Sequence, residues 1–308
     1  MDAQLTLGPA LFNWPAEQWR DFYFRIADEA PVERVCIGEV VCSKRAPLFE
    51  PFYEQVAERL HASGKTVVFS TLAEVMTSRE RQMTRDLCTM DSAWIEANDA
   101  SALYHLRGRT HAIGPFVNVY NEDTLGVLAR RGAEHFALAP ELPAKALSTL
   151  GSAARSLGKT LEVQVYGRIP LALSARCYHA RAHGRVKDDC RYVCEEDPDG
   201  MELSTVSGQP FLSVNGIQTL SHGCLNLAAE LHGMRQAGIT HFRLSPHWHD
   251  MVTVAQLFRA VLDNRLEPEE ANTRLAGLRP EIPFCNGFHH GVAGHKWLEP
   301  KRIPLEQR

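Results

Sequence analysis

The sequence of 308 residues predicts an α/β fold, a single (β/α)8 TIM-like barrel, from two observations. Eight apolar, strand-like segments recur along the chain, and a segment with helical periodicity follows nearly every one of them, which is the order of a parallel barrel. The length also suits one barrel. An open doubly wound sheet is the alternative. However, no GxGxxG follows the first strand and no GxxxxGK[ST] occurs, so the sequence lacks the motifs of two common nucleotide-binding folds of that type.

The eight predicted strands are distributed over most of the chain. They span residues 4–8, 33–38, 65–70, 93–97, 112–120, 135–139, 161–166 and 240–245. The clearest helix carries an apolar stripe at spacing i, i+3, i+4, i+7 and i+11, formed by Phe49, Phe52, Tyr53, Val56 and Leu60. Another helix begins at Pro15, because proline is favoured in a first helical turn. Further helices are expected over residues 79–90, 122–131, 143–157, 225–237 and 253–264.

Residues 168–221 interrupt this alternation after the seventh strand. The interval lacks a sustained apolar period but is dense in charge, histidine and cysteine. Long loops in compact domains are usually functional or disordered, and the three cysteines favour function. We therefore predict one domain over residues 1–308, with a cysteine-bearing insertion at about 168–221 and an irregular tail at about 280–308. Residues 210–216 are expected to add a short strand and turn.

Composition narrows the class of protein. The formal net charge of −4 and the absence of a basic run argue against nucleic acid as a partner. No secretory signal and no apolar stretch of about 20 residues occurs, so we expect a cytoplasmic protein without a membrane span. In that compartment the eight cysteines would stay thiols, which favours packing, metal or redox roles over disulfides.

Four cysteines form the strongest candidate site. Three of them, in the pattern Cys177-x12-Cys190-x3-Cys194, lie in the predicted insertion, and a tetrahedral centre needs a fourth ligand. Cys42 follows the second predicted strand. Because all loops that follow the strands of a barrel open on one face, Cys42 and the insertion can meet there.

The other cysteines have simpler interpretations. Cys36 lies on a buried strand, Cys88 in a predicted helix, and Cys224 at the start of another, and all three are expected to be structural. Cys285 in the tail is the alternative fourth ligand to Cys42.

The spacing alone does not separate zinc from an iron–sulfur cluster, because thiolates bind both. No Cys-x2-Cys pair of the kind common in zinc sites occurs, and a radical-SAM triad fails because position 197 is Asp197. Basic residues flank the cysteines, and cationic neighbours favour thiolates and offset the negative charge of a cluster. They are Arg176, Arg181, Arg185, Lys187 and Arg191.

Polar residues at the ends of the predicted strands are candidates for substrate binding or proton transfer, since these ends face the active site of a barrel. The catalytic candidates are Glu39, Glu96, Asn118 and Arg168, and Asn98, Asn121, His247 and His249 share their position. Arg168 is the strongest, because a guanidinium pairs with carboxylates and would offset cluster charge.

The motif Tyr166-Gly-Arg-Ile-Pro-Leu-Ala-Leu-Ser-Ala-Arg-Cys177 resembles the signature of the collagenase-like peptidase superfamily. One branch, which acts in oxygen-independent ubiquinone synthesis, resembles the chain more closely. That resemblance rests on the cysteine spacing together with 38-GEVVCSKR-45, 115-PFVNVYN-121 and 284-FCNGFHHG-291. It covers nearly the whole chain.

The resemblance implies a [4Fe–4S] cluster on Cys42, Cys177, Cys190 and Cys194. It also implies a heterodimer with a homologous, UbiU-like companion that carries its own cluster. The pair would support hydroxylation of ubiquinone precursors without dioxygen, with prephenate suggested as the oxygen source.

Two alternatives remain at this stage, a collagenase-like peptidase and a zinc-stabilised scaffold without enzymatic activity. Against the peptidase, the sequence has neither His-Glu-x-x-His nor Gly-x-Ser-x-Gly. A cysteine nucleophile formed by Cys177 and His179 is conceivable, but one thiolate cannot both hold a cluster and attack a peptide.

Overall fold

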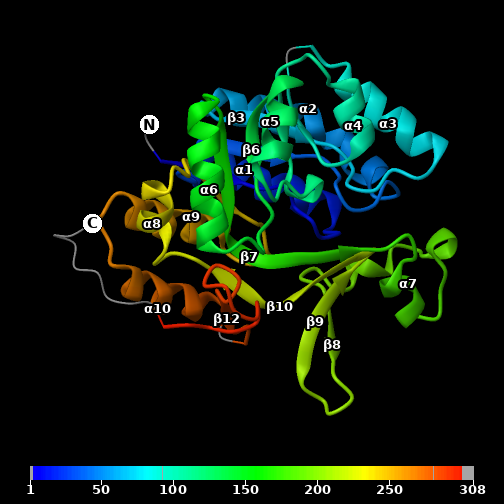
Figure 1. Cartoon of the computed structure of the whole chain (residues 1–308). Helices are drawn as coiled ribbons and strands as arrows, with labels where there is room; N and C mark the ends of the chain where they lie inside the picture. The colour runs from blue at the N-terminus through cyan, green and yellow to red at the C-terminus, as the bar shows by residue number, and fades with distance from the viewer. Residues whose placement is uncertain (1–2, 92, 280, 300–308) are drawn as a thin grey trace.

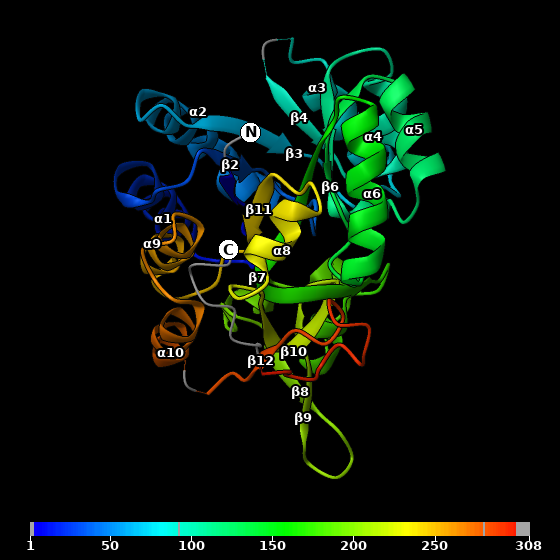
Figure 2. The same cartoon turned by 60° about the vertical axis from the view of Figure 1, so that its left-hand side comes forward.

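The computed structural model describes residues 3–91, 93–279 and 281–299. Within these residues, eight parallel strands close into a barrel in the order β1, β2, β3, β4, β5, β6, β7 and β11 (Figure 1 and Figure 2). β11 closes it by pairing in parallel with both β1 and β7. The predicted barrel is confirmed. Its strands are β1 (Gln4–Leu7), β2 (Arg34–Ile37), β3 (Thr66–Ser70), β4 (Trp94–Ala97), β5 (His111–Ile113), β6 (Ala133–Ala137), β7 (Thr160–Leu173) and β11 (His241–Leu244).

Amphipathic helices cover the outside of the barrel. The predicted stripe of α2 buries Phe49, Val56 and Leu60, and the Phe49 ring stacks on Trp19 of α1 with ring centroids 5.3 Å apart. The barrel helices are α1 (Ala16–Glu29), α2 (Ala46–Ala62), α3 (Ser78–Cys88), α4 (Ala100–His105), α5 (Glu122–Arg130), α6 (Ala144–Ser156), α8 (Leu231–Gln236), α9 (Met251–Leu262) and α10 (Pro268–Leu278).

The cysteine-bearing insertion begins as a continuation of strand β7 and is not a separate loop. β7 continues past the barrel and pairs in antiparallel fashion with β10, which pairs with β9, which pairs with β8. Figure 1 shows β7 leaving the barrel toward α7, with the β8–β9 hairpin projecting away from it. These elements are β8 (Met201–Ser204), β9 (Pro210–Asn215), β10 (Gln218–Asn226), α7 (Tyr178–Ala182) and the 3-10 turns η2 (Lys187–Asp189) and η3 (Val193–Glu195), and β12 (Phe284–Cys285) adds to β10.

Two sequence predictions are wrong in part. The strand predicted over 112–120 ends at Ile113, because Pro115 opens the 3-10 turn η1 (Pro115–Val117), which ends at Asn118 in the left-handed region, φ 59°. The helix predicted over 225–237 forms only as α8, since the first residues of that segment belong to β10. Cys224 therefore lies in a strand, opposite Arg168, and does not open a helix. A short apolar segment is compatible with either a strand or a helix, so the sequence pattern alone does not distinguish them.

A buried ion-pair network fills the barrel interior. Arg243 of β11 contacts both Glu96 of β4 and Glu162 of β7, and His135 Nε2 lies 3.2 Å from Glu162 Oε2. Although burial disfavours every charge, Arg243 holds the pKa of Glu162 well below its usual value. Such a network is costly to disrupt, because removal of one partner leaves an unpaired buried charge.

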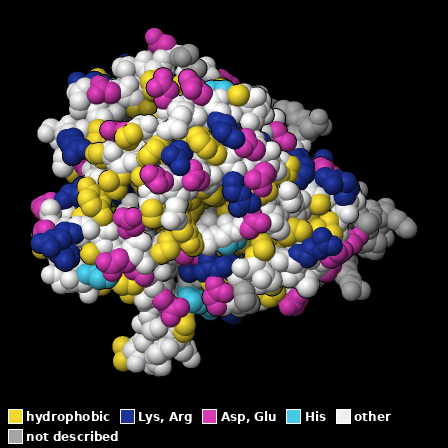
Figure 3. Space-filling model, turned by 180° about the vertical axis from the view of Figure 1, so that it is seen from behind, with side chains coloured by type: hydrophobic (Ala, Val, Ile, Leu, Met, Phe, Trp, Pro, Cys, Tyr) yellow, Lys and Arg dark blue, Asp and Glu magenta, His cyan; other side chains and the backbone are white. Residues whose placement is uncertain are grey.

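The outer surface mixes both signs of charge. Figure 3 shows acidic and basic side chains interspersed over the face seen from behind, with the β8–β9 hairpin projecting below. Among the residues that the structure describes, no helix combines the length and apolarity needed to cross a membrane.

The start of α3 is tied to the loop that carries Cys42 through Glu80. Ser43 Oγ donates to Glu80 Oε1 (2.7 Å), while Oε2 accepts the N–H groups of Met76 (2.9 Å) and Thr77 (2.8 Å). Burial alone would raise the pKa of Glu80, but the hydrogen bonds from Ser43, Thr77 and Met76 outweigh it and lower the pKa from 4.5 to about 2.

We expect Glu80→Ala to lower the free energy of unfolding by about 2 kcal/mol at neutral pH, because a capping box and a link to Ser43 are lost. The lowered pKa means that this contribution is complete above pH 4.5 and is lost as the pH falls toward 2. Urea unfolding at several pH values measures it. Glu58→Ala on the exposed face of α2 is the control, and an equal loss in both variants contradicts the assignment.

Candidate metal centre

The four predicted cysteines come from two segments that are far apart in sequence. Cys42 lies in the loop between β2 and α2. Cys177 caps α7, where its Sγ accepts the N–H of Ala180 at 3.4 Å. Cys190 follows η2, and Cys194 lies within η3. The insertion therefore supplies three thiols and the barrel supplies one.

All four cysteines line one small cavity at the junction of the loop and the insertion. The cavity has a volume of about 20 Å³. This is close to the roughly 10–15 Å³ that one water molecule needs, so the space between the four cysteines is about the size of one water molecule. Its other lining residues are Lys44, Arg45, Lys187, Tyr192, Val193 and Gly216. Among the described residues, no carboxylate or imidazole lines this cavity, so its donor set is four sulfurs, which fits a thiolate-bound zinc ion or iron–sulfur cluster.

Arg45 places a buried positive charge beside this cavity. The side chain is 1% exposed, and its guanidinium donates from Nη1 to Leu11 O (3.2 Å) and from Nη2 to Asn215 Oδ1 (2.6 Å). Burial alone would lower the pKa of Arg45, but the negative charges available on Cys194, Glu39 and Cys42 raise it above its usual value. Arg45 thus stays charged and can offset the charge of thiolates.

Burial favours the protonated form of two of the four thiols, those of Cys42 and Cys177. Burial raises the pKa of Cys42 and of Cys177 above the usual thiol value, although Arg45 lowers both. Metal binding must therefore release protons, because thiolates are the ligands. Basic neighbours reduce that cost.

Two polar side chains hold the parts of the centre together. Glu39 Oε1 accepts the N–H groups of Val41 and Cys42, both at 2.8 Å, and so fixes the conformation of the Cys42 loop. Asn215 accepts from Arg45 through Oδ1, and its Nδ2 donates to the backbone oxygens of Cys194 and Asp197, both at 2.9 Å. A single amide therefore connects the barrel loop to the cysteine segment.

The remaining cysteines lie elsewhere. Cys36 is buried on β2, Cys88 ends α3 and Cys224 lies in β10. Cys285, the alternative fourth ligand, is buried in β12, where it pairs with Leu225 of β10, and it does not line the four-cysteine cavity.

The other predicted site residues are dispersed. Of the catalytic candidates only Glu39 reaches the cysteine loop. Glu96 is the buried partner of Arg243 inside the barrel, and Asn118 is exposed at the end of η1. Arg168 donates to the backbone oxygens of Ser221 and His222 on β10, and burial lowers its pKa. It secures the insertion and does not line the sulfur cavity.

Four further candidates have structural contacts. Asn98 donates to Thr71 O (3.1 Å), and Asn121 caps α5. His247 Nδ1 contacts Asp199 Oδ1 (2.8 Å), and His249 Nε2 contacts the Tyr166 hydroxyl (3.1 Å).

Sequence reasoning missed Arg45 and Asn215 as parts of the centre. Arg45 lies three residues after Cys42, so the sequence places it near that cysteine but does not indicate that its side chain contacts the centre. Asn215 lies inside the extra strand expected over 210–216, and nothing in its local pattern marks a buried amide.

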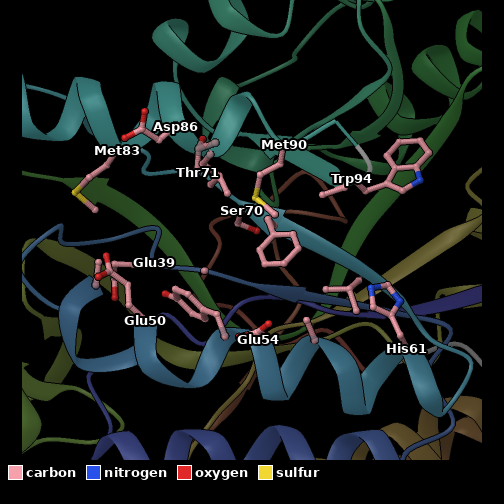
Figure 4. Close-up of a pocket in the computed structure, with 18 of the residues that line it drawn as sticks. Glu39, Glu50, Glu54, His61, Ser70, Thr71, Met83, Asp86, Met90 and Trp94 are labelled. Atoms are coloured by element: carbon pink, nitrogen blue, oxygen red, sulfur yellow. The ribbon is translucent and has the colours of Figure 1, made fainter.

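A much larger cavity, about 1090 Å³, lies on the outer face of β3 between α2 and α3 (Figure 4). Its floor includes Val67 and Phe69, while Glu50 and Glu54 of α2 form part of its acidic edge. Glu39 lines one end of it, so this groove and the Cys42 loop share one side chain.

The fold and the candidate centre define a class of protein: a TIM-like barrel whose strand-end loop and insertion bring four thiols to one small cavity. The family model for peptidase family U32 matches residues 16–297, and the chain belongs to this family.

Similar solved structures include a dihydropteroate synthase from Thermus thermophilus, at 11% identity and a TM-score of 0.41 over 89% of this chain and 94% of that one. The tryptophan synthase complex from Pyrococcus furiosus matches at 12% identity and a TM-score of 0.39, over 90% and 98%. An enolase, a putative galactarate dehydratase, from Agrobacterium radiobacter matches at 12% identity and a TM-score of 0.36. That match covers 53% of this chain and 45% of the enolase chain, so it spans less than half of the enolase.

Gly216 offers a test of the contact with Arg45. Its φ is +67°, and a Cβ at this position would clash with Arg45 Nη2. Gly208 in the β8–β9 turn has a similar φ of +80°, but a Cβ there meets no atom within 4 Å.

We expect Gly208→Ala to cost about 1 kcal/mol of stability from backbone strain alone. Gly216→Ala should cost at least about 2 kcal/mol more, because the buried guanidinium must move. Urea unfolding of both variants provides the comparison. Equal losses would show that Arg45 is not confined against residue 216.

Proposed function

We propose that the chain binds a [4Fe–4S] cluster through Cys42, Cys177, Cys190 and Cys194 and acts as a UbiV-like subunit of an oxygen-independent hydroxylation system. The observation that carries this proposal is the convergence of these four thiols, from two distant segments, on one small cavity. Membership of family U32 is consistent with the sequence resemblance that implies the same ligand set.

The surroundings of the thiols suit a negatively charged, thiolate-bound metal centre. Arg45, Lys44 and Lys187 line the cavity, and Lys44 Nζ donates to Lys187 O at 2.7 Å. A thiolate-bound cluster carries negative charge that such neighbours stabilise. Zinc bound by four thiolates would also suit the donor set, so metal analysis decides between them.

The proposed role follows from the chemistry that such a cluster supplies when bound, which is electron transfer. The reaction would hydroxylate the aromatic ring of a ubiquinone precursor without dioxygen, with prephenate as the proposed oxygen source. In this scheme the residues of the chain hold the thiolates, exclude water from them and offset their charge through Arg45. A homologous UbiU-like companion would complete the system as a heterodimer in the cytoplasm.

Peptidase chemistry, suggested by the family name, finds less support in the geometry. A cysteine nucleophile needs an imidazole within hydrogen-bond reach. Cys177 Sγ instead accepts the Ala180 N–H, and the ring nitrogens of His179 face Val214 O and Asp197 Oδ2. Cys177 and His179 therefore do not form the thiol–imidazole pair that a cysteine peptidase needs.

The ligand assignment predicts which cysteines control iron content. After purification without oxygen, Cys42→Ala should lose nearly all stable iron and sulfide, because an open iron site invites oxidation. Cys285→Ala, also a buried thiol, is the matched control and should keep both. Iron, sulfide and zinc analysis measures the outcome. Full iron in the Cys42 variant, or zinc in place of iron and sulfide in the unmodified chain, refutes the proposal.

The proposed heterodimer predicts co-purification. A tagged chain expressed together with a UbiU-like homologue should elute with it from a sizing column in a one-to-one ratio under anaerobic conditions. A chain that elutes alone as a monomer under these conditions contradicts the partnership, whatever its iron content.

A further inference from the structure

Three metal-ligating side chains outside the cysteine set converge on the insertion. His179 lies in α7 and His183 follows its end, one helical turn later, while Asp197 follows η3. One donor atom from each of the three lies within 4.8 Å of the others. The trio is close to the cysteines in sequence, because His179 is two residues after Cys177 and Asp197 is three residues after Cys194.

Backbone contacts fix the tautomer of both imidazoles. His179 Nδ1 lies 3.2 Å from Val214 O, and His183 Nδ1 lies 3.0 Å from His179 O. A carbonyl oxygen only accepts hydrogen bonds, so each Nδ1 carries a proton and each neutral ring presents a lone pair on Nε2. The two rings are parallel, with an interplanar angle of 3° and centroids 5.2 Å apart. A backbone carbonyl on the far nitrogen is the usual support of a metal-binding histidine.

The buried Nε2 of His179 lacks a hydrogen-bond partner. The side chain of His179 is 0% exposed, yet this nitrogen lies only 2.9 Å from Asp197 Oδ2 without hydrogen-bond geometry. A lone pair that faces a carboxylate oxygen at this distance is repulsive unless a proton or a metal ion lies between them. Two ligands about 2.1 Å from one metal ion are about 3.0 Å apart at a right angle and about 3.4 Å apart at a tetrahedral angle, so the observed contact lies at the short end of this range.

We propose that His179, His183 and Asp197 bind a divalent first-row transition-metal ion, a site separate from the four cysteines. Two imidazoles and one carboxylate suit zinc or ferrous iron. The side chains of His183 and Asp197 are 30% and 33% exposed, so solvent can fill the remaining coordination positions. The Glu196 carboxylate lies on this side, 3.8 Å from His183 Nε2.

The site would join the segment after Cys177 to the segment after Cys194. Among the contacts on the described part of the insertion, Asn215 makes a related connection through the backbone oxygens of Cys194 and Asp197. A metal ion on the three side chains would tie the same Cys194 segment to α7 as well. This role does not depend on whether the cysteines hold a cluster.

The test uses Zn²⁺ with the full chain purified without oxygen. After equilibration with Zn²⁺ and removal of excess ion, we expect one zinc per chain with only nitrogen and oxygen neighbours, at about 2.0–2.2 Å in X-ray absorption spectra. His183→Ala and Asp197→Asn should each weaken Zn²⁺ binding at least tenfold, while the iron and sulfide content stays unchanged. His222→Ala is the matched control, because His222 pairs with Glu202 on the same insertion at 3.5 Å.

Three outcomes overturn the proposal: no bound zinc, zinc with sulfur neighbours, or zinc retained in both variants. The first would mean that His179 holds a proton toward Asp197 instead of a metal ion. Iron and sulfide analysis tests the cysteine centre independently. A chain without iron that still binds zinc through nitrogen and oxygen ligands would contradict only the proposed cluster.

Discussion

The buried guanidinium of Arg45 is the interaction on which the cysteine centre depends. It joins the loop after β1, through Leu11 O, to the insertion, through Asn215 Oδ1. Because Arg45 lies in the same loop as Cys42, this contact also fixes where the barrel's thiol stands relative to the other three. A charge buried to this degree is stable only with partners, and removal of one partner of a buried charge typically costs about 3–5 kcal/mol. The barrel loop and the insertion are therefore coupled by electrostatics as well as by packing.

The continuous strand β7 gives the insertion a rigid base. Its first part pairs with β6 and β11 in the barrel, and its last part pairs with β10 in the insertion. Further contacts hold the insertion in place, because Asp199 contacts His247 and Arg279 while Trp14 Nε1 donates to Pro198 O at 2.6 Å. The three cysteines of the insertion thus lie on anchored backbone, which a preorganised metal centre requires.

The sequence predicts the barrel well because its strands are apolar segments with helices between them. This pattern can be recognised from the sequence without knowledge of tertiary contacts. Where a prediction fails, a tertiary contact decides the structure: 218–226 becomes β10 because β7 extends to meet it. The cysteine spacing predicted which thiols converge, since three lie close in sequence and the barrel rule places Cys42 on the same face. The sequence predicts that Arg168 offsets the charge of a cluster, but Arg168 bonds to the backbone of β10, and Arg45 lines the four-cysteine cavity. Which cation reaches a cavity depends on side-chain packing that no local pattern encodes.

We propose that these four sulfurs hold one iron–sulfur cluster. Native mass spectrometry of the anaerobically purified chain measures the mass of the bound inorganic centre without depending on any one spectroscopic signature. We expect the intact chain to exceed its polypeptide mass by four iron and four sulfide ions, with or without one additional divalent metal ion. A mass increase that corresponds to zinc alone, or to the polypeptide without iron, would contradict it.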